Sequence, residues 1–256
     1  MDNPWKDIVA TDKVKIIKDD KSALKDYVRK CSCPSESNQN KDSLNQWPEP
    51  YIGNPGAPVY LLNGNPGYSN LDHLFTEDPV FVDIMKRNLR HDSLDNLNDF
   101  VYFNTLHTRG LVHGGCQWWM NKTKDLRMAL DGSHPFIFDL EYSPFHSKNG
   151  VMPDLNKLMQ TKAYQYTNYL LKLAIESDKI LILMRKQKLW MDRLKQVASE
   201  KSLTLHEEKI MKLSSVNNVC LSSKNLKFWD DTSTINGRTA WDTLLEELRK
   251  HSHNKF

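Results

Sequence analysis

Two stretches of the sequence pass from buried-type residues to polar residues that could do chemistry. The stretch PVYLLNGNPGYSNLD at residues 58–72 starts as an apolar strand and continues into amides and glycines. The stretch FIFDLEYSPFHS at residues 136–147 leads from an apolar run to Glu141 and His146. The Asn65 side-chain amide could orient a water molecule, Glu141 could pair with a polar ligand edge, and His146 could donate a hydrogen bond. These residues would suit a ligand-binding pocket at the ends of two strands.

Each of these residues also has an ordinary structural interpretation. Asn65 could form an Asx-turn with the proline that follows it, and Gly67 could serve a positive backbone angle. Glu141 could form an ion pair with Arg185 or Lys224 at the end of the sheet. The histidine of the second stretch could be polar surface.

The elements that must position these residues follow from apolar runs and helical spacing. Two amphipathic helices are expected at residues 153–177 and 189–199, and a charged helix at residues 13–30. Strands that alternate with crossover helices predict an α/β fold, a three-layer α/β/α sandwich with a four-stranded parallel sheet. Ligands are then expected at the carboxyl ends of the strands. The expected strands are residues 58–63, 136–141, 179–184 and 217–221.

Composition limits the class of protein. The chain has 256 residues, and 35 Lys and Arg against 32 Asp and Glu give a net charge of +3. This mild excess permits a nucleic-acid partner without requiring one. No stretch approaches the ~20 apolar residues of a membrane span, so we expect a cytoplasmic protein with no membrane partner. We expect a monomer without a cofactor. We expect no metal site, because no metal-site spacing connects the 4 cysteines, Cys31, Cys33, Cys116 and Cys220.

The arrangement resembles the uracil-DNA glycosylase superfamily. Asn65-Pro66-Gly67 is similar to the end of the G-x-N-P-G first motif of the mismatch- and thymine-type branch. Asn63 stands where that motif begins with glycine, and Gly64 fills its variable position. The segment at residues 221–226 occupies the place of the last motif, with Ser222 where the family has histidine or asparagine.

The resemblance covers residues 58–226 and implies a fold and a division of the chain. The strand order would be second, first, third, fourth. Residues 1–47 would form an N-terminal helical extension and linker, and residues 48–256 a glycosylase-like α/β domain. The segment at residues 100–124 has no counterpart in the family. Its Trp118 and Trp119, with the basic residues after them, could contact nucleic acid or form an aromatic core beside a solvated helix.

The resemblance also implies roles for individual residues in cleaving the N-glycosidic bond of a base flipped out of DNA. Asn65 and His146 would be catalytic, with Asn65 positioning the water. The base would be contacted by Gly64, Gly67, Tyr68, Glu141 and Ser222. The DNA would be contacted by Arg185, Lys224, Asn225 and Leu226, the last as an apolar wedge.

Two departures from the uracil-specific branch point to a different base. Gly67 replaces a tyrosine that closes the pocket over C5, and Glu141 replaces an asparagine that pairs with uracil. A carboxyl group suits a cytosine edge, which presents an amine and a ring acceptor. The sequence therefore predicts a glycosylase for 5-substituted cytosine, with antiviral defence as a further hypothesis. A uracil or mismatch repair glycosylase, an inactive nucleic-acid-binding relative and a small-molecule enzyme using the same pocket remain alternatives.

Overall fold

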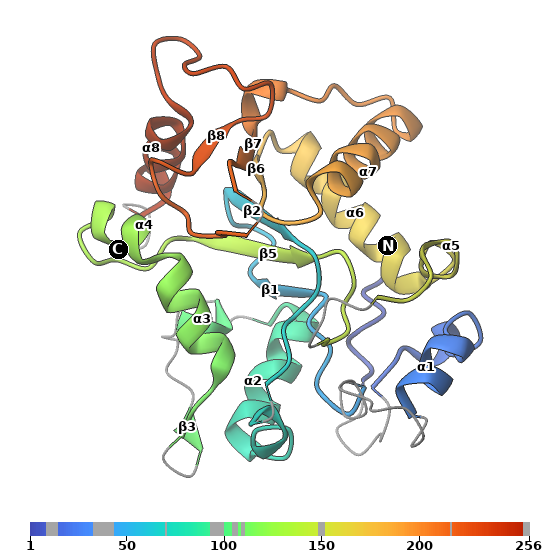
Figure 1. The fold of residues 1–256 in the computed structure, drawn as a ribbon. Helices are drawn as coiled ribbons and strands as arrows, with labels where there is room; N and C mark the ends of the chain where they lie inside the picture. The colour runs from blue at the N-terminus through green and yellow to red at the C-terminus, as the bar shows by residue number, and fades with distance from the viewer. Residues whose placement is uncertain are drawn as a thin grey trace.

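The computed structural model describes residues 1–8, 15–32, 44–69, 71–92, 100–103, 107–108, 111–147, 152–215 and 217–252. A six-stranded sheet forms its centre, in the order β1-β5-β2-β6-β7-β8 (Figure 1). The four inner strands run parallel, and β1 and β8 pair antiparallel at the two edges. The strands are β1 Tyr51–Gly53, β2 Val59–Asn63, β5 Ile137–Glu141, β6 Ile180–Leu183, β7 Ile210–Leu213 and β8 Leu226–Phe228.

The central strands are apolar on both faces because helices cover both faces of the sheet. Every residue of β2, β5 and β6 is buried. In the register of β2 with β5, Asn63 lies opposite Glu141, so the polar ends of both strands reach the same edge of the sheet. This alignment places the two stretches singled out in the sequence next to one another.

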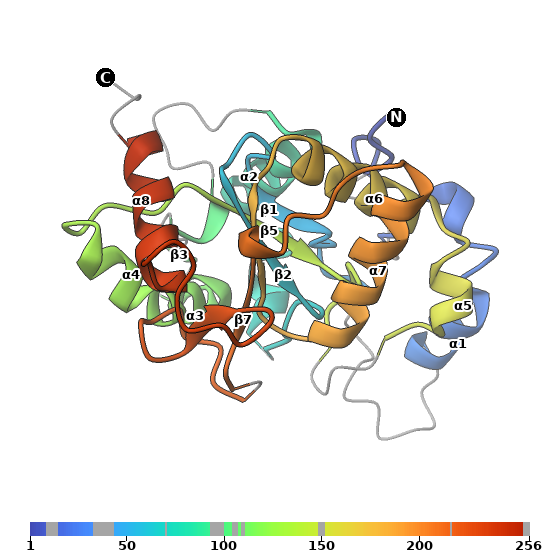
Figure 2. The same ribbon diagram turned by 90° about the horizontal axis from the view of Figure 1, so that it is seen from above.

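Helices lie on both sides of the sheet (Figure 2). The crossovers from β5 to β6 and from β6 to β7 carry α6 and α7, which pack against each other on one side. On the other side lie α3, α4 and α8, and α2 packs beside the edge strand β1. These helices are α2 Pro79–Arg90, α3 Gly114–Lys122, α4 Lys124–Ala129, α6 Lys162–Glu176, α7 Gln187–Glu200 and α8 Ala240–Ser252.

Shorter elements complete the described part of the chain. Besides the 3-10 turns at Lys18–Asp20, Asp72–Leu74, Val101–Phe103 and Glu207–Lys209, they are α1 Lys25–Ser32, α5 Leu155–Leu158, β3 His107–Thr108 and β4 Leu111–Val112. Helix α2 begins at an Asp78 cap, whose carboxylate accepts from the backbone N–H groups of Val80 and Phe81. None of the helices within these described residues is long and apolar enough to cross a membrane.

The N-terminal segment packs into the rest of the protein. Trp5 and Trp47 belong to the main hydrophobic core, and Leu24 forms a second cluster with Phe145. The buried Asp20 carboxylate accepts hydrogen bonds from two backbone N–H groups at the start of α6, at 2.7 and 3.1 Å. Residues before position 48 thereby help to fix one crossover helix.

The α/β class is confirmed, but the expected four-stranded parallel sheet is wrong, because two antiparallel edge strands extend it. The expected fourth strand is also misplaced: β7 lies at Ile210–Leu213, and residues 217–221 form a loop. Lys212 interrupts the apolar pattern of β7 and hides it in the sequence. The Lys212 ammonium group lies 2.7 Å from a carboxylate oxygen of Asp231, and it also lies over the Trp229 ring.

The predicted helices are partly confirmed. Residues 153–177 form α5 and α6, divided at Thr161, whose hydroxyl caps the second helix. Residues 189–199 lie within α7. Of the charged helix expected at residues 13–30, residues 13 and 14 lie outside the described residues, and the helix α1 begins only at Lys25.

Candidate active site

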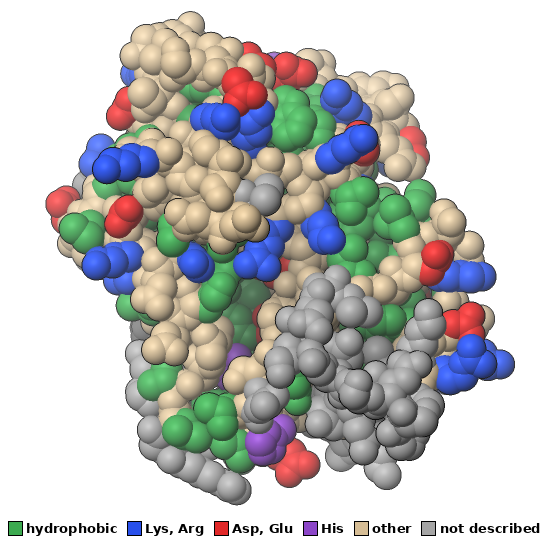
Figure 3. Space-filling model, viewed as in Figure 1, with side chains coloured by type: hydrophobic (Ala, Val, Ile, Leu, Met, Phe, Trp, Pro, Cys, Tyr) green, Lys and Arg blue, Asp and Glu red, His purple; other side chains and the backbone are tan. Residues whose placement is uncertain are grey.

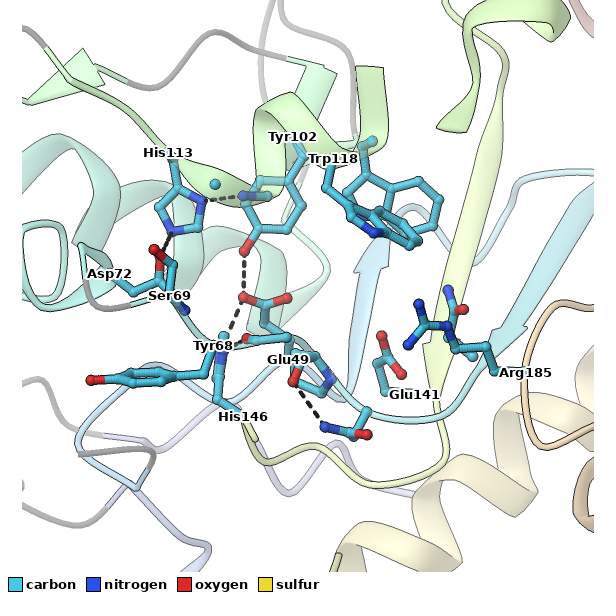
Figure 4. Close-up of a pocket in the computed structure, with 17 residues that line it drawn as sticks. Glu49, Tyr68, Ser69, Asp72, Tyr102, His113, Trp118, Glu141, His146 and Arg185 are labelled. Atoms are coloured by element: carbon cyan, nitrogen blue, oxygen red, sulfur yellow. Dashed lines mark hydrogen bonds and ion pairs between the residues drawn. The ribbon is translucent and has the colours of Figure 1, made fainter. Parts of the chain in front are cut away.

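A cavity of about 290 Å³ opens at the carboxyl ends of β2 and β5 (Figure 4). The turn before β1, the 3-10 turn at Val101–Phe103, the start of α3 and Arg185, two residues after β6, complete its wall. The predicted site residues that line it are Asn65, Gly67, Tyr68, Glu141, His146 and Arg185. Gly64, Ser222, Lys224, Asn225 and Leu226 do not line it.

Backbone hydrogen bonds join the loops that follow β2 and β5. The Gly64 carbonyl accepts from the N–H of Ser143 at 3.0 Å, and the Pro66 carbonyl accepts from the N–H of Ser147 at 3.1 Å. Gly64 is buried in this junction, where an added Cβ would come within 3.3 Å of the Lys186 side chain. Gly64 therefore supports the wall of the cavity from behind.

Asn65 projects an amide oxygen that can serve as an acceptor. Its Nδ2 donates to the Pro66 carbonyl at 3.0 Å, a bond that differs from the Asx-turn considered above. Among the described residues, no hydrogen bond reaches Oδ1 of Asn65. The fixed amide can therefore accept a hydrogen bond from a water molecule in the cavity.

Gly67 leaves open space in the cavity wall. A Cβ built on Gly67 would meet no heavy atom within 4 Å. Gly67 is also absent from the described glycines that have a positive φ, so backbone conformation does not require glycine at this position. The consequence of this glycine is room for a ligand.

Glu141 places a carboxyl group without a hydrogen-bond partner in the cavity wall. Its side chain is buried, and Oε2 accepts or donates no hydrogen bond among the described residues. No ion pair within 4 Å joins it to Arg185 or Lys224 in the part of the chain that the structure describes, so the predicted structural pairing is not formed. Burial raises the pKa of Glu141 well above its ordinary value, the nearby Asp139 and Glu49 carboxyls raise it further, and Arg185 opposes them. These effects favour the protonated acid.

A second carboxyl lies beneath it in the sheet. Asn63 Nδ2 donates to Asp139 Oδ1 at 2.6 Å. Burial raises the pKa of Asp139 well above its ordinary value, although the bond from Asn63 lowers it. Asn63, which replaces the leading glycine of the family motif, is therefore engaged in holding a buried acid.

His146 is held by acceptors on both ring nitrogens. Nδ1 lies 2.6 Å from the Gly67 carbonyl oxygen, and Nε2 lies 2.9 Å from the Trp47 carbonyl oxygen and 3.2 Å from Glu49 Oε1. Burial alone would lower the pKa of His146, but the Glu49 carboxylate and these hydrogen bonds raise it to about 9. Both nitrogens therefore donate, and the ring is an imidazolium at neutral pH.

This geometry disfavours the expected role of His146 as a donor to the departing base. A ring whose two N–H groups already bind acceptors in the protein has none to offer to a departing base. His146 instead fixes the Gly67 carbonyl and thereby the Asn65-Pro66-Gly67 turn. It is a positioning residue that also places a positive charge beside the cavity.

Glu49 and Tyr102 complete this buried group and were missed in the sequence. The Tyr102 hydroxyl donates to Glu49 Oε1 (Figure 4). Burial would raise the pKa of Glu49, but the charge of His146 and these hydrogen bonds lower it, so the carboxylate is ionised. The one sequence signal was an acid between two prolines in WPEP at residues 47–50.

Asp72 and His113 line the opposite end of the cavity and were also missed. Asp72 Oδ2 accepts from the N–H of Ser69 at 2.7 Å, and Oδ1 lies 3.9 Å from His113 Nε2. His113 caps α3, because its Nδ1 accepts from the N–H of Gly115 at 3.0 Å. Burial raises the pKa of Asp72 and lowers that of His113. No sequence motif connects these residues, which the fold brings together.

Trp118 and Trp119 have different roles. Trp119 is buried and packs edge-on against Phe100, as expected for an aromatic core. Trp118 is half-buried and lines the cavity. The Arg185 guanidinium carbon lies 6.0 Å from the centre of the Trp118 ring, and Lys122 Nζ lies 5.9 Å from it. Figure 3 shows Lys and Arg side chains around a recess near the middle of the face of the molecule that it draws.

The segment expected to match the last family motif lies beside this face but serves mainly to build a turn. The Leu221 N–H donates to the Lys122 carbonyl at 2.9 Å, which places the segment against the end of α3. The Ser222 carbonyl accepts from two backbone N–H groups, and the Asn225 side chain donates to the Asn218 and Cys220 carbonyls. Of the three predicted DNA contacts in this segment, Lys224 is exposed, whereas Asn225 and Leu226 are buried.

Leu226 does not fit the expected wedge. It begins β8, pairs with Leu213 in the sheet, and is 6% exposed within the hydrophobic core. A side chain in this position cannot enter DNA without breaking the edge of the sheet. The apolar residue of the motif is explained by packing.

The described residues contain no group of three or more His, Cys, Asp or Glu side chains arranged to hold a metal ion. Cys116 is buried and Cys220 is half-buried, and neither forms a disulfide among the described residues, whereas Cys33 and the Cys31 side chain lie outside the described part.

No family model, curated protein or solved structure matches the chain.

Proposed function

We propose that the protein is a monofunctional DNA N-glycosylase that hydrolyses the bond between deoxyribose and a flipped-out base, leaving an abasic site. The observation that carries the proposal is the buried carboxyl of Glu141, whose Oε2 has no hydrogen-bond partner among the described residues, in the same cavity as Asn65. A buried carboxyl without a protein partner is costly unless a ligand supplies the hydrogen bonds. A nucleobase edge is a ligand that would do so.

The proposed reaction uses Asn65 and Glu141 for different parts of the substrate. A water molecule held by Asn65 Oδ1 forms a bond to C1′ of the sugar, and the bond from C1′ to N1 of the base breaks. The base departs as an anion with the electron pair of the broken bond, and the proton that the water loses passes through solvent to the departed base, so that the products are the C1′ hydroxyl and the neutral base. The Glu141 acid donates to the base ring, and the fixed charge of His146 stabilises the negative charge that develops there.

We propose 5-substituted cytosine as the base. The acid form of Glu141 can accept from the exocyclic amine of cytosine through its carbonyl oxygen and donate to the ring nitrogen through its hydroxyl. The open space beside Gly67 would receive a substituent on C5. We extend this to a role in antiviral defence. An enzyme that releases only bases with a substituent foreign to the host would leave the DNA of the host intact.

Uracil is a second candidate because Glu141 favours the protonated form. A carboxylic acid is both donor and acceptor, so it also matches the ring N–H and the carbonyl at position 4 of uracil. Only the ionised carboxylate, which cannot donate to the carbonyl at position 4, would disfavour uracil. Repair of uracil or mismatches is therefore the alternative.

Exposed cations, one of them Arg185 in the cavity wall, support DNA as the ligand. The exposed cations Arg185, Lys186 and Lys224 make no ion pair with any described carboxylate, so their charge is available to phosphates. Trp118 offers a ring face near Arg185 on which a base could stack. We expect the exposed cations to contact phosphates outside the cavity and the residues that line the cavity to contact the base inside it.

The test is abasic-site formation under single turnover on duplexes that differ at one base. The panel contains cytosine, uracil, a thymine mismatch, 5-methylcytosine, 5-hydroxymethylcytosine and glucosylated 5-hydroxymethylcytosine. We expect release of a 5-substituted cytosine faster than uracil. Faster release of uracil would favour the repair alternative, and tight binding without release from any duplex would favour an inactive relative.

A further inference from the structure

The Asp72 end of the cavity contains a buried carboxyl oxygen that the reaction described above does not use. The Asp72 side chain is 7% exposed, and its Oδ1 forms no hydrogen bond within the described residues. Its other oxygen is held by the N–H of Ser69 at 2.7 Å, which fixes the direction of the carboxyl group. The contact of Oδ1 with His113 Nε2, at 3.9 Å, is too long for a hydrogen bond.

One glycine lies beside this oxygen, and a second leaves open space elsewhere in the wall of the same cavity. A Cβ on Gly114 would lie 3.7 Å from Ser69 Cβ and 3.8 Å from Asp72 Oδ1, and a Cβ on Gly67 would meet nothing within 4 Å. Both glycines line the cavity together with Asp72. Figure 4 shows Asp72 and Glu141 on opposite sides of it. A ligand that reaches both carboxyls must therefore extend beyond the edge that binds Glu141.

The charges around Asp72 select a neutral hydrogen-bond donor. The imidazolium of His146 and the N-terminal end of α3 contribute positive charge near Asp72, and the Glu49 carboxylate that pairs with His146 contributes negative charge, so the surroundings as a whole do not favour a cationic group. The Asp72 oxygen itself disfavours an anion. A hydroxyl group can donate to the carboxyl oxygen or accept from its protonated form, so it satisfies Asp72 in either state.

We propose that Asp72, with the open space at Gly67 and Gly114, forms a subsite for a hydroxyl group carried by a substituent on C5 of the base. The placement of C5 toward Gly67 rests on the proposed function. The subsite separates bases with a hydroxylated substituent from bases with an apolar one, because a bare methyl group would leave the buried oxygen without a partner.

The test is titration calorimetry with two nucleosides, 5-hydroxymethyl-2′-deoxycytidine and 5-methyl-2′-deoxycytidine. The wild-type protein should bind the first roughly 10-fold more tightly, the scale of one hydrogen bond to a charged group. Asp72→Ala should reduce this preference to near parity. Gly114→Ala should do the same by filling the subsite, and it keeps the test valid if Asp72→Ala does not fold. Asp154→Ala, which removes an aspartate cap from α5 outside the cavity, should keep the full preference.

Excision assays on the same proteins separate this subsite from the proposed function. Preference for the hydroxymethyl nucleoside without release of any base would support the subsite and overturn the glycosylase proposal. Base release together with equal binding of the two nucleosides would support the glycosylase proposal and overturn the subsite. A preference that survives in both Asp72→Ala and Gly114→Ala would overturn the subsite.

Discussion

His146 Nε2 lies 3.2 Å from Glu49 Oε1, and both side chains are buried beneath the cavity. The pair joins the turn before β1 to the loop after β5. Since the same imidazole donates to the Gly67 carbonyl, the ion pair also holds the turn that carries Asn65. Stability and site geometry should therefore depend on the same two residues.

Removing Glu49 should leave an uncompensated buried imidazolium. We expect Glu49→Ala to lower the free energy of unfolding by about 3–5 kcal/mol, the usual cost of breaking a buried ion pair. Tyr102→Phe, which removes only the hydroxyl that donates to Glu49, should cost about 1 kcal/mol. Urea unfolding at pH 7 measures both, with the exposed Glu77→Ala as the control. A loss for Glu49→Ala no larger than that for Glu77→Ala would contradict the assignment.

The pH dependence of stability should report the His146 proton. The folded-state pKa of about 9 lies above the ordinary value of 6.5, so the folded protein binds this proton more tightly than the unfolded chain. The stabilisation is complete below pH 6.5 and is lost as the pH rises through 9. The stability difference between wild type and His146→Gln should therefore shrink from pH 6 to pH 10. A difference that stays constant over this range would mean that the ring is neutral in the folded state.

Glu141→Gln tests whether the acid form of Glu141 binds the base. Glutamine keeps one donor and one acceptor but does not titrate. Wild-type base release should fall as the pH rises through the raised pKa of Glu141, whereas Glu141→Gln should lose that limb of the profile. The variant should also gain stability relative to wild type as the pH rises, because ionising a buried acid of raised pKa costs folding free energy. Identical pH profiles would exclude titration of Glu141 as the cause.

Particular residues show how far sequence reasoning reached. The run from Val59 to Asn63 is apolar on both faces and ends in turn residues, so both the strand and the position of Asn65 at its end could be predicted. The position of β7 could not be predicted, because Lys212 interrupts its run of apolar residues. The place of Glu49 in the site could not be predicted, because its partners Tyr102 and His146 are distant in sequence and meet it only in the folded protein. Leu226 misled, because a leucine in a motif and a leucine in a core look alike in sequence.

Two exposed cations, Arg185 in the cavity wall and Lys224 on the surface, should contribute to affinity through phosphate contacts. Arg185→Ala and Lys224→Ala should each weaken DNA binding and reduce the slope of log K against log salt by about 1. Lys195→Ala removes the same charge from an exposed position on α7 and should leave the slope unchanged. The measurement is fluorescence anisotropy with one duplex across a salt series. Equal slopes for all three variants would place the DNA on another face.

The central claim is that Asn65 positions the water that releases the base, and one measurement tests it most directly. Single-turnover base release and duplex affinity are compared for wild type, Asn65→Ala and Asn156→Ala, on the substrate that wild type cleaves fastest. Asn156 is an exposed asparagine in α5 and provides the matched control. The account predicts that Asn65→Ala loses at least ~100-fold in rate, with duplex affinity unchanged and Asn156→Ala indistinguishable from wild type. Base release by Asn65→Ala at the wild-type rate would contradict it.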